Sequence, residues 1–152
     1  MKRIAIVMFL FFILFSVSTY SQSKGFGLGI ILGEPTGISA KYWTTSSTAL
    51  DFGLGYSFEN NSTFHLHADY LFHVNNVFQS SENIALYYGP GARLKLVDEG
   101  SSRFGFRFDV GLVWIPKGSP IDVFVEVAPI MDIIPETSFS FNGGIGVRYF
   151  FN

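Results

Sequence analysis

Large apolar residues occupy every second position along most of the chain. The clearest case is the segment RFGFRFDVGLVW at 103–114, in which each even-numbered position from Phe104 to Trp114 is large and apolar. Alternation with a period of two is typical of a β-strand whose two faces differ in polarity. The segment therefore predicts a strand, and the direction of its apolar face decides which class of protein this is.

Seven further segments show the same alternation and are separated by turn residues. They span residues 25–33, 38–43, 49–58, 63–73, 84–96, 121–133 and 139–151. The longest connection between them is 74–83. Short strands at regular spacing, with no helical period between them, predict one all-β domain, either a barrel or a sandwich.

The first residues have a different character. Lys2 and Arg3 precede an unbroken apolar run at 4–15, and small or polar residues follow it. This order predicts a secretory signal peptide at 1–21, cleaved after Ser21, with the mature chain at 22–152. The apolar run is too short for a membrane-spanning helix of about 20 residues, although an uncleaved anchor remains the alternative.

The composition of the two strand faces favours an outward-pointing apolar face. Directed inward, the apolar residues would overfill an eight-stranded barrel, whose interior is only wide enough for ordinary side chains. The opposite faces carry glycine and isolated charges, which suit a narrow polar lumen better than a solvated surface. The exported chain also has no cysteine, so disulfides do not stabilise it.

These observations predict an eight-stranded antiparallel up-and-down transmembrane β-barrel with a polar lumen. Strands of about 10 residues span a bilayer when they are tilted by about 45°. A soluble exported barrel of the lipocalin kind is the alternative. Eight strands also predict a plugged lumen and not an open conducting pore. A narrow path that passes only water or protons remains an alternative.

The charged residues of the inward faces are expected to form a polar network inside the barrel. The cations are Lys41, Arg93, Lys95, Arg103, Arg107 and Arg148. The carboxylates are Asp51, Asp69, Asp109, Asp122 and Glu126. Because buried ion pairs can lose as much to desolvation as they gain by attraction, we expect this network to act on specificity more than on stability.

Outward aromatic residues are expected to form two girdles at the membrane interfaces, as in other transmembrane barrels. With the first strand starting on the periplasmic side, one girdle contains Phe26, Tyr42, Tyr70, Phe72, Tyr88, Trp114, Tyr149 and Phe151. The other contains Tyr56, Phe58, Phe64, Phe104 and Phe139.

The final segment, GGIGVRYFFN, resembles the closing strand of bacterial outer-membrane barrels. Gly146, Tyr149 and Phe151 stand at the spacing that the barrel-assembly machinery reads in that family, whereas Asn152 follows the aromatic residue that usually ends the chain. The whole mature chain resembles the OmpX and OmpA transmembrane-domain class. Within it, GEPTGISAKYW, YYGPGARLK and VEVAPIMDIIPETS resemble a poorly characterised subfamily of small outer-membrane barrels. The resemblance implies an outer-membrane location and architecture and supplies no catalytic residues.

Two groups of residues are candidates for chemistry. His65, His67 and Asp69 alternate on one strand face, as a metal site on a strand requires, although ordinary hydrogen bonding in the lumen is the simpler interpretation. Ser57 and His65 lie near one rim, with Asp51 or Asp69 further in, and such a pair is a candidate for lipid hydrolysis or acyl transfer.

The sequence therefore predicts a non-catalytic outer-membrane barrel with a structural or interaction role and no cofactor. The alternatives are an enzyme that modifies lipid A or phospholipid, and a barrel that binds a surface ligand. Short outer connections count against the latter, because loops usually carry recognition in such barrels. We expect a monomer in contact with outer-membrane lipid. The net charge of −2 does not favour nucleic acid as a partner.

Overall fold

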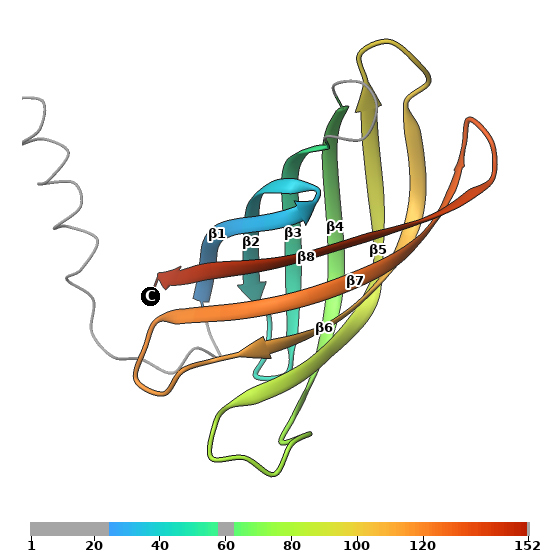
Figure 1. Ribbon diagram of the computed structural model, residues 1–152. Helices are drawn as coiled ribbons and strands as arrows, with labels where there is room; N and C mark the ends of the chain where they lie inside the picture. The colour runs from blue at the N-terminus through green and yellow to red at the C-terminus, as the bar shows by residue number, and fades with distance from the viewer. Residues whose placement is uncertain (1–24, 58–62, 152) are drawn as a thin grey trace, which may run out of the picture.

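The strands of this computed structural model form a closed barrel (Figure 1). The structure describes residues 25–57 and 63–151. The predicted signal peptide, the first mature residues 22–24, Phe58 of the predicted girdle, the 59–62 turn and Asn152 therefore lie outside the described residues. Each strand pairs antiparallel with the next along the chain, and β8 closes the barrel by pairing with β1. The prediction of an eight-stranded antiparallel up-and-down barrel is confirmed.

The strand bounds differ from the predicted ones by at most two residues, and those of 103–114 are unchanged. They are β1 (Gly25–Glu34), β2 (Thr36–Trp43), β3 (Thr48–Ser57), β4 (Thr63–Asn75), β5 (Ile84–Val97), β6 (Arg103–Trp114), β7 (Ile121–Ile134) and β8 (Ser138–Phe151). Within these described residues, no helix is both long and apolar enough to cross a membrane.

The barrel has two unlike ends, which we name the base and the mouth. The base holds the start of β1, the end of β8 and the connections 44–47, 76–83 and 115–120. The mouth holds the other connections, among them Pro35, 98–102 and 135–137. The longest predicted connection thus lies at the base.

The rim of the mouth is uneven. Figure 1 shows the β5–β6 and β7–β8 hairpins extending well beyond the β1–β2 hairpin. The last pair between β1 and β8 joins Glu34 to Gly143, whereas β8 continues its pairing with β7 as far as Ser138. Among the described strands, the first part of β8 is therefore paired on one side only.

The apolar strand faces point outward. In β6, the side chains of Phe106 and Phe108 are 53% and 46% exposed, whereas the alternate residues Arg107 and Asp109 are buried. The other strands follow the same rule, with a few apolar residues facing inward, most of them toward the base. The barrel therefore presents an apolar exterior and encloses its charges.

Glycines on the inward faces make room for aromatic rings on neighbouring strands. A Cβ atom added to Gly27 would lie 2.7 Å from ring carbons of Phe150, its cross-strand partner. The same relation joins three further cross-strand pairs, Gly53 with His67, Gly111 with Tyr87, and Gly146 with Phe124. A narrow barrel can bury these rings because the opposing position lacks a side chain.

Apolar side chains fill the lumen toward the base. Two buried clusters, both in contact with Ile115, occupy this region. One contains Ile31, Leu71, Ala85, Tyr87, Val113 and Phe124, and the other contains Trp43, Ala49 and Phe150. The polar groups are thus stacked between this apolar base and the open mouth.

Candidate functional site in the barrel lumen

The deepest ion-pair cluster is centred on Arg148 of β8. Its Nε donates a hydrogen bond to Asp122, its cross-strand partner, at 3.0 Å, and its Nη1 donates to Asp51 of β3 at 2.5 Å and to Ser39 at 3.3 Å. The guanidinium lies 3.9 Å from the ring centroid of Phe124. One cation therefore joins β2, β3, β7 and β8 across the lumen.

Lys41 lies beside this cluster and is fully buried. Its Nζ is 2.8 Å from Nε2 of His73, which accepts its hydrogen bond. The ammonium also lies 5.0 Å from the ring centroid of Trp43 and 4.9 Å from that of Tyr87, within the range of cation–π attraction. Aromatic faces thus supply much of the surroundings of this charge.

Arg107 of β6 forms the middle cluster with three carboxylates. Its Nε lies 3.1 Å from Asp69, at ion-pair distance but without the geometry of a hydrogen bond. Its Nη2 lies 3.6 Å from Glu126 and 3.8 Å from Asp109. The hydroxyl of Tyr87 donates to Glu126 at 3.0 Å. The middle of the lumen is therefore crossed by a second cation held among carboxylates.

Arg93 of β5 forms the third cluster, closer to the mouth. Its Nη2 donates to Asp132 at 2.5 Å and to Ser140 at 3.3 Å, and its Nη1 donates to the side-chain oxygen of Asn142 at 3.4 Å. The partners come from β7 and β8. The three arginines, on β5, β6 and β8, thus each contact side chains of other strands, at successive levels between the base and the mouth.

The histidines predicted as weak metal ligands lie inside the lumen. Nδ1 of His67 is 3.2 Å from Nε2 of His65, and Nε2 of His67 is 3.8 Å from Asp69. Nδ2 of Asn142 is 3.4 Å from Nε2 of His65. The described residues contain no group of three or more His, Cys, Asp or Glu side chains arranged to hold a metal ion.

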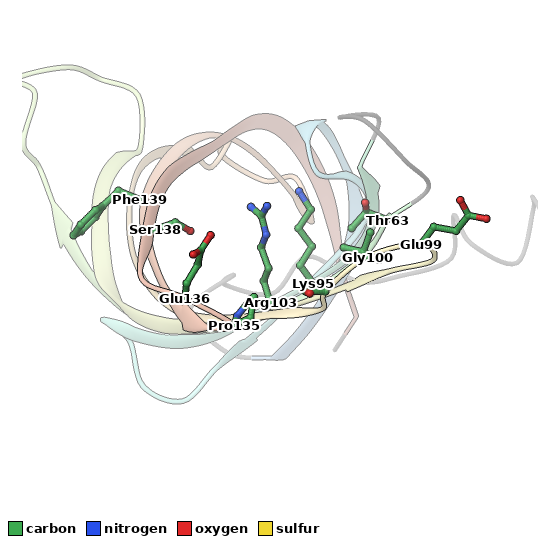
Figure 2. A pocket seen from close by; sticks show the side chains of 11 residues that line it. Thr63, Lys95, Glu99, Gly100, Arg103, Pro135, Glu136, Ser138 and Phe139 are labelled. Atoms are coloured by element: carbon green, nitrogen blue, oxygen red, sulfur yellow. The ribbon is translucent and has the colours of Figure 1, made fainter.

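Ten of the eleven predicted lumen residues are buried, and Arg103 is the exception. Its side chain is exposed and projects into the mouth beside Lys95 (Figure 2). Arg103 thus lies on the predicted inward face but outside the buried part of the network. Its face was assigned correctly, but Arg103 is the first residue of β6 and lies above the level at which the lumen is closed.

Sequence reasoning left several members out of the network, namely Asp132, His73, Tyr87 and Asn142. All four stand at inward positions of the alternation. The period of two along each strand was therefore the signal that could have found them. Asp132 pairs with Gly105, and the register of β6 with β7 shifts by one residue immediately beyond it. With Asp132 included, the described residues hold five buried lysines and arginines and six buried carboxylates.

The candidate enzymatic pair is only partly described. The backbone register pairs Ser57 with Thr63 and His65 with Gly55. His65 is fully buried and its ring meets the ring of His67 edge-on, with centroids 5.4 Å apart. The side chain of Ser57 lies outside the described residues, so the pair stays a prediction.

The chain matches a solved structure by fold and no known family by sequence. It is similar to the crystal structure of the N-terminal β-barrel domain of Pseudomonas aeruginosa OprF, with a TM-score of 0.60 and 11% sequence identity. The match covers 84% of this chain and 98% of that chain. The fold is that of a small OmpA/OmpX-type barrel. No family model matches the sequence, and no curated protein matches it significantly.

Proposed function

We propose that the protein is an integral outer-membrane barrel with a plugged polar lumen and a structural or interaction role, and that it is not an enzyme. The observation that carries this proposal is that one closed sheet has an apolar exterior and a charged interior. Lipid requires every backbone polar group to be paired within the protein, which a closed barrel achieves. An apolar outside with a polar inside is the pattern of transmembrane barrels.

Three buried arginine clusters support a plugged lumen. Arg148, Arg107 and Arg93 each reach side chains of other strands, and apolar rings fill the base below them. A barrel of eight strands encloses only enough space for side chains, whereas open aqueous channels occur in barrels of about 16 strands. We therefore expect no ion conductance from the protein in a planar bilayer.

The proposal includes a cleaved signal peptide, monomeric assembly and insertion by the barrel-assembly machinery through β8. The outward aromatic residues of that strand, Tyr149 and Phe151, lie with their ring centroids 5.0 Å apart at the base. In the proposed orientation the base faces the periplasm and the mouth faces outward. The OprF barrel domain supports this location through its fold alone.

Expression of the full chain in a Gram-negative bacterium tests the proposal. We expect the protein in the outer-membrane fraction, with an N-terminus at Gln22 and faster gel migration before boiling than after boiling. Recovery from the soluble periplasm in a form that stays folded without detergent would favour the lipocalin-like alternative. In that case the membrane proposal fails.

Single-cysteine variants test the orientation, because the chain has no cysteine of its own. Ser102→Cys places a thiol in the β5–β6 connection at the mouth, and Ser81→Cys places one in the β4–β5 connection at the base. Both positions are exposed. A membrane-impermeant maleimide should label Ser102→Cys on intact cells and Ser81→Cys only after lysis. The reverse result would show that the base, and not the mouth, faces outward.

A further inference from the structure

The first part of β8, residues 138–142, forms an open sheet edge at the mouth. Pairing of β8 with β7 begins at Ser138, whereas pairing of β8 with β1 begins only at Gly143, opposite Glu34. The chain turns at Pro35 into β2, so the β1–β2 hairpin ends well short of the β7–β8 hairpin (Figure 1). Within the described residues, no strand therefore covers the β1 side of 138–142.

The backbone groups at this open edge belong to Phe139 and Phe141. Along a strand, the N–H and C=O groups of alternate residues point to the same side. The carbonyl oxygens of Gly143 and Val147 point toward β1, where each is the atom nearest to a Cβ atom added on that strand. Phe141 also lies opposite Pro129 of β7, which has no N–H group to donate. The odd-numbered residues of β8 thus direct their backbone groups to the β1 side, and the two phenylalanines do so beyond the end of β1.

This edge lacks the usual protection against strand pairing. Edge strands in natural proteins commonly carry charged residues or proline, which prevent a further strand from adding. Residues 137–142 contain neither. Phe139 and Phe141 are instead 78% and 72% exposed, the highest values among the large apolar side chains of the described residues. The edge therefore offers both backbone hydrogen-bonding groups and an apolar outer face to a further strand.

Neither a second copy of this chain nor a lipid chain fits such an edge. Two copies inserted in the same direction are related by an axis along the membrane normal. Strands tilted by about 45° from the normal then cross at about 90°, whereas neighbouring strands of a sheet differ in direction by only about 20–25°. A lipid acyl chain could cover the phenylalanine rings, but it has no group that pairs with backbone N–H and C=O. Only the backbone of a different polypeptide meets both requirements.

We propose that the edge of β8 at 138–142 binds an extended segment of another polypeptide by strand addition. This proposal specifies the interaction role given under the proposed function, and its exclusion of a second copy rests on the membrane location proposed there. The added segment runs antiparallel to β8, in line with β1 beyond Glu34, and exchanges hydrogen bonds with the backbone of Phe139 and Phe141.

The chemistry of the partner follows from the alternation of β8. Directly opposite residues of an antiparallel pair place their side chains on the same face of the sheet. The partner segment therefore carries apolar side chains at the positions opposite Phe139 and Phe141, which point outward, and small polar ones at the positions opposite Ser140, which faces inward. In the proposed orientation the mouth faces outward, so this partner is a protein at the cell surface.

Strand-forming peptides test the proposal with the full chain in lipid nanodiscs. The probe is a fluorescein-labelled peptide of alternating valine and threonine with a lysine at each end for solubility. Two further peptides carry N-methyl groups either on every valine or on every threonine. In the proposed pairing, the valines face outward beside the two phenylalanines and also present their N–H groups to β8. Fluorescence anisotropy measures binding, with empty nanodiscs as the reference.

Substitutions at Phe141 separate backbone pairing from apolar contact. Phe141→Pro removes the ring and an N–H group that faces the open edge, whereas Phe141→Thr removes the ring and keeps the N–H group. Phe139→Pro is a second test of the same kind if Phe141→Pro does not fold. Phe106→Thr is the matched control, because Phe106 is an exposed ring on β6, which is paired on both sides at this position. Gel mobility before and after boiling verifies that each variant is folded.

The unmethylated peptide and the threonine-methylated peptide should bind saturably, with Kd below about 1 mM, and the valine-methylated peptide at least about tenfold more weakly. Phe141→Pro should weaken binding by about tenfold or more, because a backbone hydrogen bond is lost. Phe141→Thr should weaken it by about fivefold at most, the effect of one cross-strand side-chain pair. Phe106→Thr should change nothing.

The proposal is overturned if no peptide binds at about 1 mM, or if the valine-methylated peptide binds as well as the unmethylated one. Equal losses for Phe141→Pro and Phe141→Thr would assign the patch to apolar contact, such as that of a lipid chain, and would also overturn it. A dimer in native mass spectrometry that Phe141→Pro dissociates would assign the edge to a second copy, with the same consequence. None of these results contradicts the membrane-barrel proposal, because gel mobility and fractionation measure that proposal separately.

Discussion

Arg148 and Asp122 are cross-strand partners whose side chains meet inside the barrel, with Nε of the guanidinium 3.0 Å from Oδ1 of the carboxylate. Both are almost completely buried. The same guanidinium reaches Asp51 on β3, which is three strands away from β8 around the barrel. A single side chain therefore links the strand that closes the barrel to a distant part of its wall.

Removal of this cation should destabilise the barrel strongly. Arg148→Met leaves Asp51 and Asp122 as buried charges without their cation, and the loss of one partner of a buried ion pair costs about 3–5 kcal/mol. The measurement is urea unfolding of the full chain in lipid vesicles, followed by gel mobility. Lys117→Met is the control, because Lys117 is exposed at the base. The argument would be contradicted if the free energy of unfolding of Arg148→Met lay within about 0.5 kcal/mol of that of the control.

The packing of aromatic rings over glycine predicts a specific pairwise effect at the seam between β1 and β8. Gly27→Ala should destabilise the barrel by about 1–3 kcal/mol, the usual cost of overpacking, because the atoms nearest the added methyl group all belong to the ring of Phe150. Phe150→Leu should relieve this clash. In a double-mutant cycle of unfolding free energies, the combined variant should therefore lose less than the sum of the single losses, and simple additivity would refute the packing argument.

A charge on the outer face tests whether that face meets lipid. Val127 is 49% exposed midway along β7, and Val127→Arg should cost about 2–4 kcal/mol if the position lies near the middle of a bilayer. Val77→Arg is the matched control, since Val77 is 44% exposed in the β4–β5 connection. The readout is the urea midpoint in lipid vesicles. Equal midpoints for the two variants would show that the outer face of β7 is not in lipid.

Added zinc should leave the stability of the protein unchanged. The nitrogens of His65 and His67 face each other at 3.2 Å, and Asp69, the third candidate ligand, lies 3.1 Å from the guanidinium of Arg107. That positive charge opposes a metal ion at the same place. Thermal unfolding with and without zinc checks this, because a ligand of the native state raises the midpoint. A rise that disappears in His65→Gln would establish a metal site.

Much of the fold could be predicted from alternation alone, since a period of two fixes both the strands and the side of the sheet on which each residue lies. The alternation predicted that Lys41, Asp51 and Arg148 lie on the inward faces, and all three are buried there. The same alternation places Asp132 and His73 at inward positions, although the predicted network omitted both. The sequence therefore contained the information needed to include them.

The position of a residue along the barrel axis could not be predicted from the alternation of apolar and polar residues. Arg103 and Arg107 share one face of β6, yet Arg107 is held among three carboxylates and Arg103 lies open at the mouth. The difference depends on how far the neighbouring strands extend and on the stagger that closes the sheet. A sequence gives no direct measure of either quantity.

The sequence by itself determined that the chain alternates into eight strands, that each strand has an apolar and a polar face, and which residues share a face. Only the tertiary structure decided which charges meet, because the partners of Arg148 and Arg93 come from strands far apart in the chain. It also decided that Lys95, Arg103 and Glu136 share one open cavity, since closing the sheet brings the β5–β6 and β7–β8 hairpins to the same rim. The physical reason is that side-chain direction is a local property of the strand, whereas contact across the lumen depends on closure and register of the whole barrel.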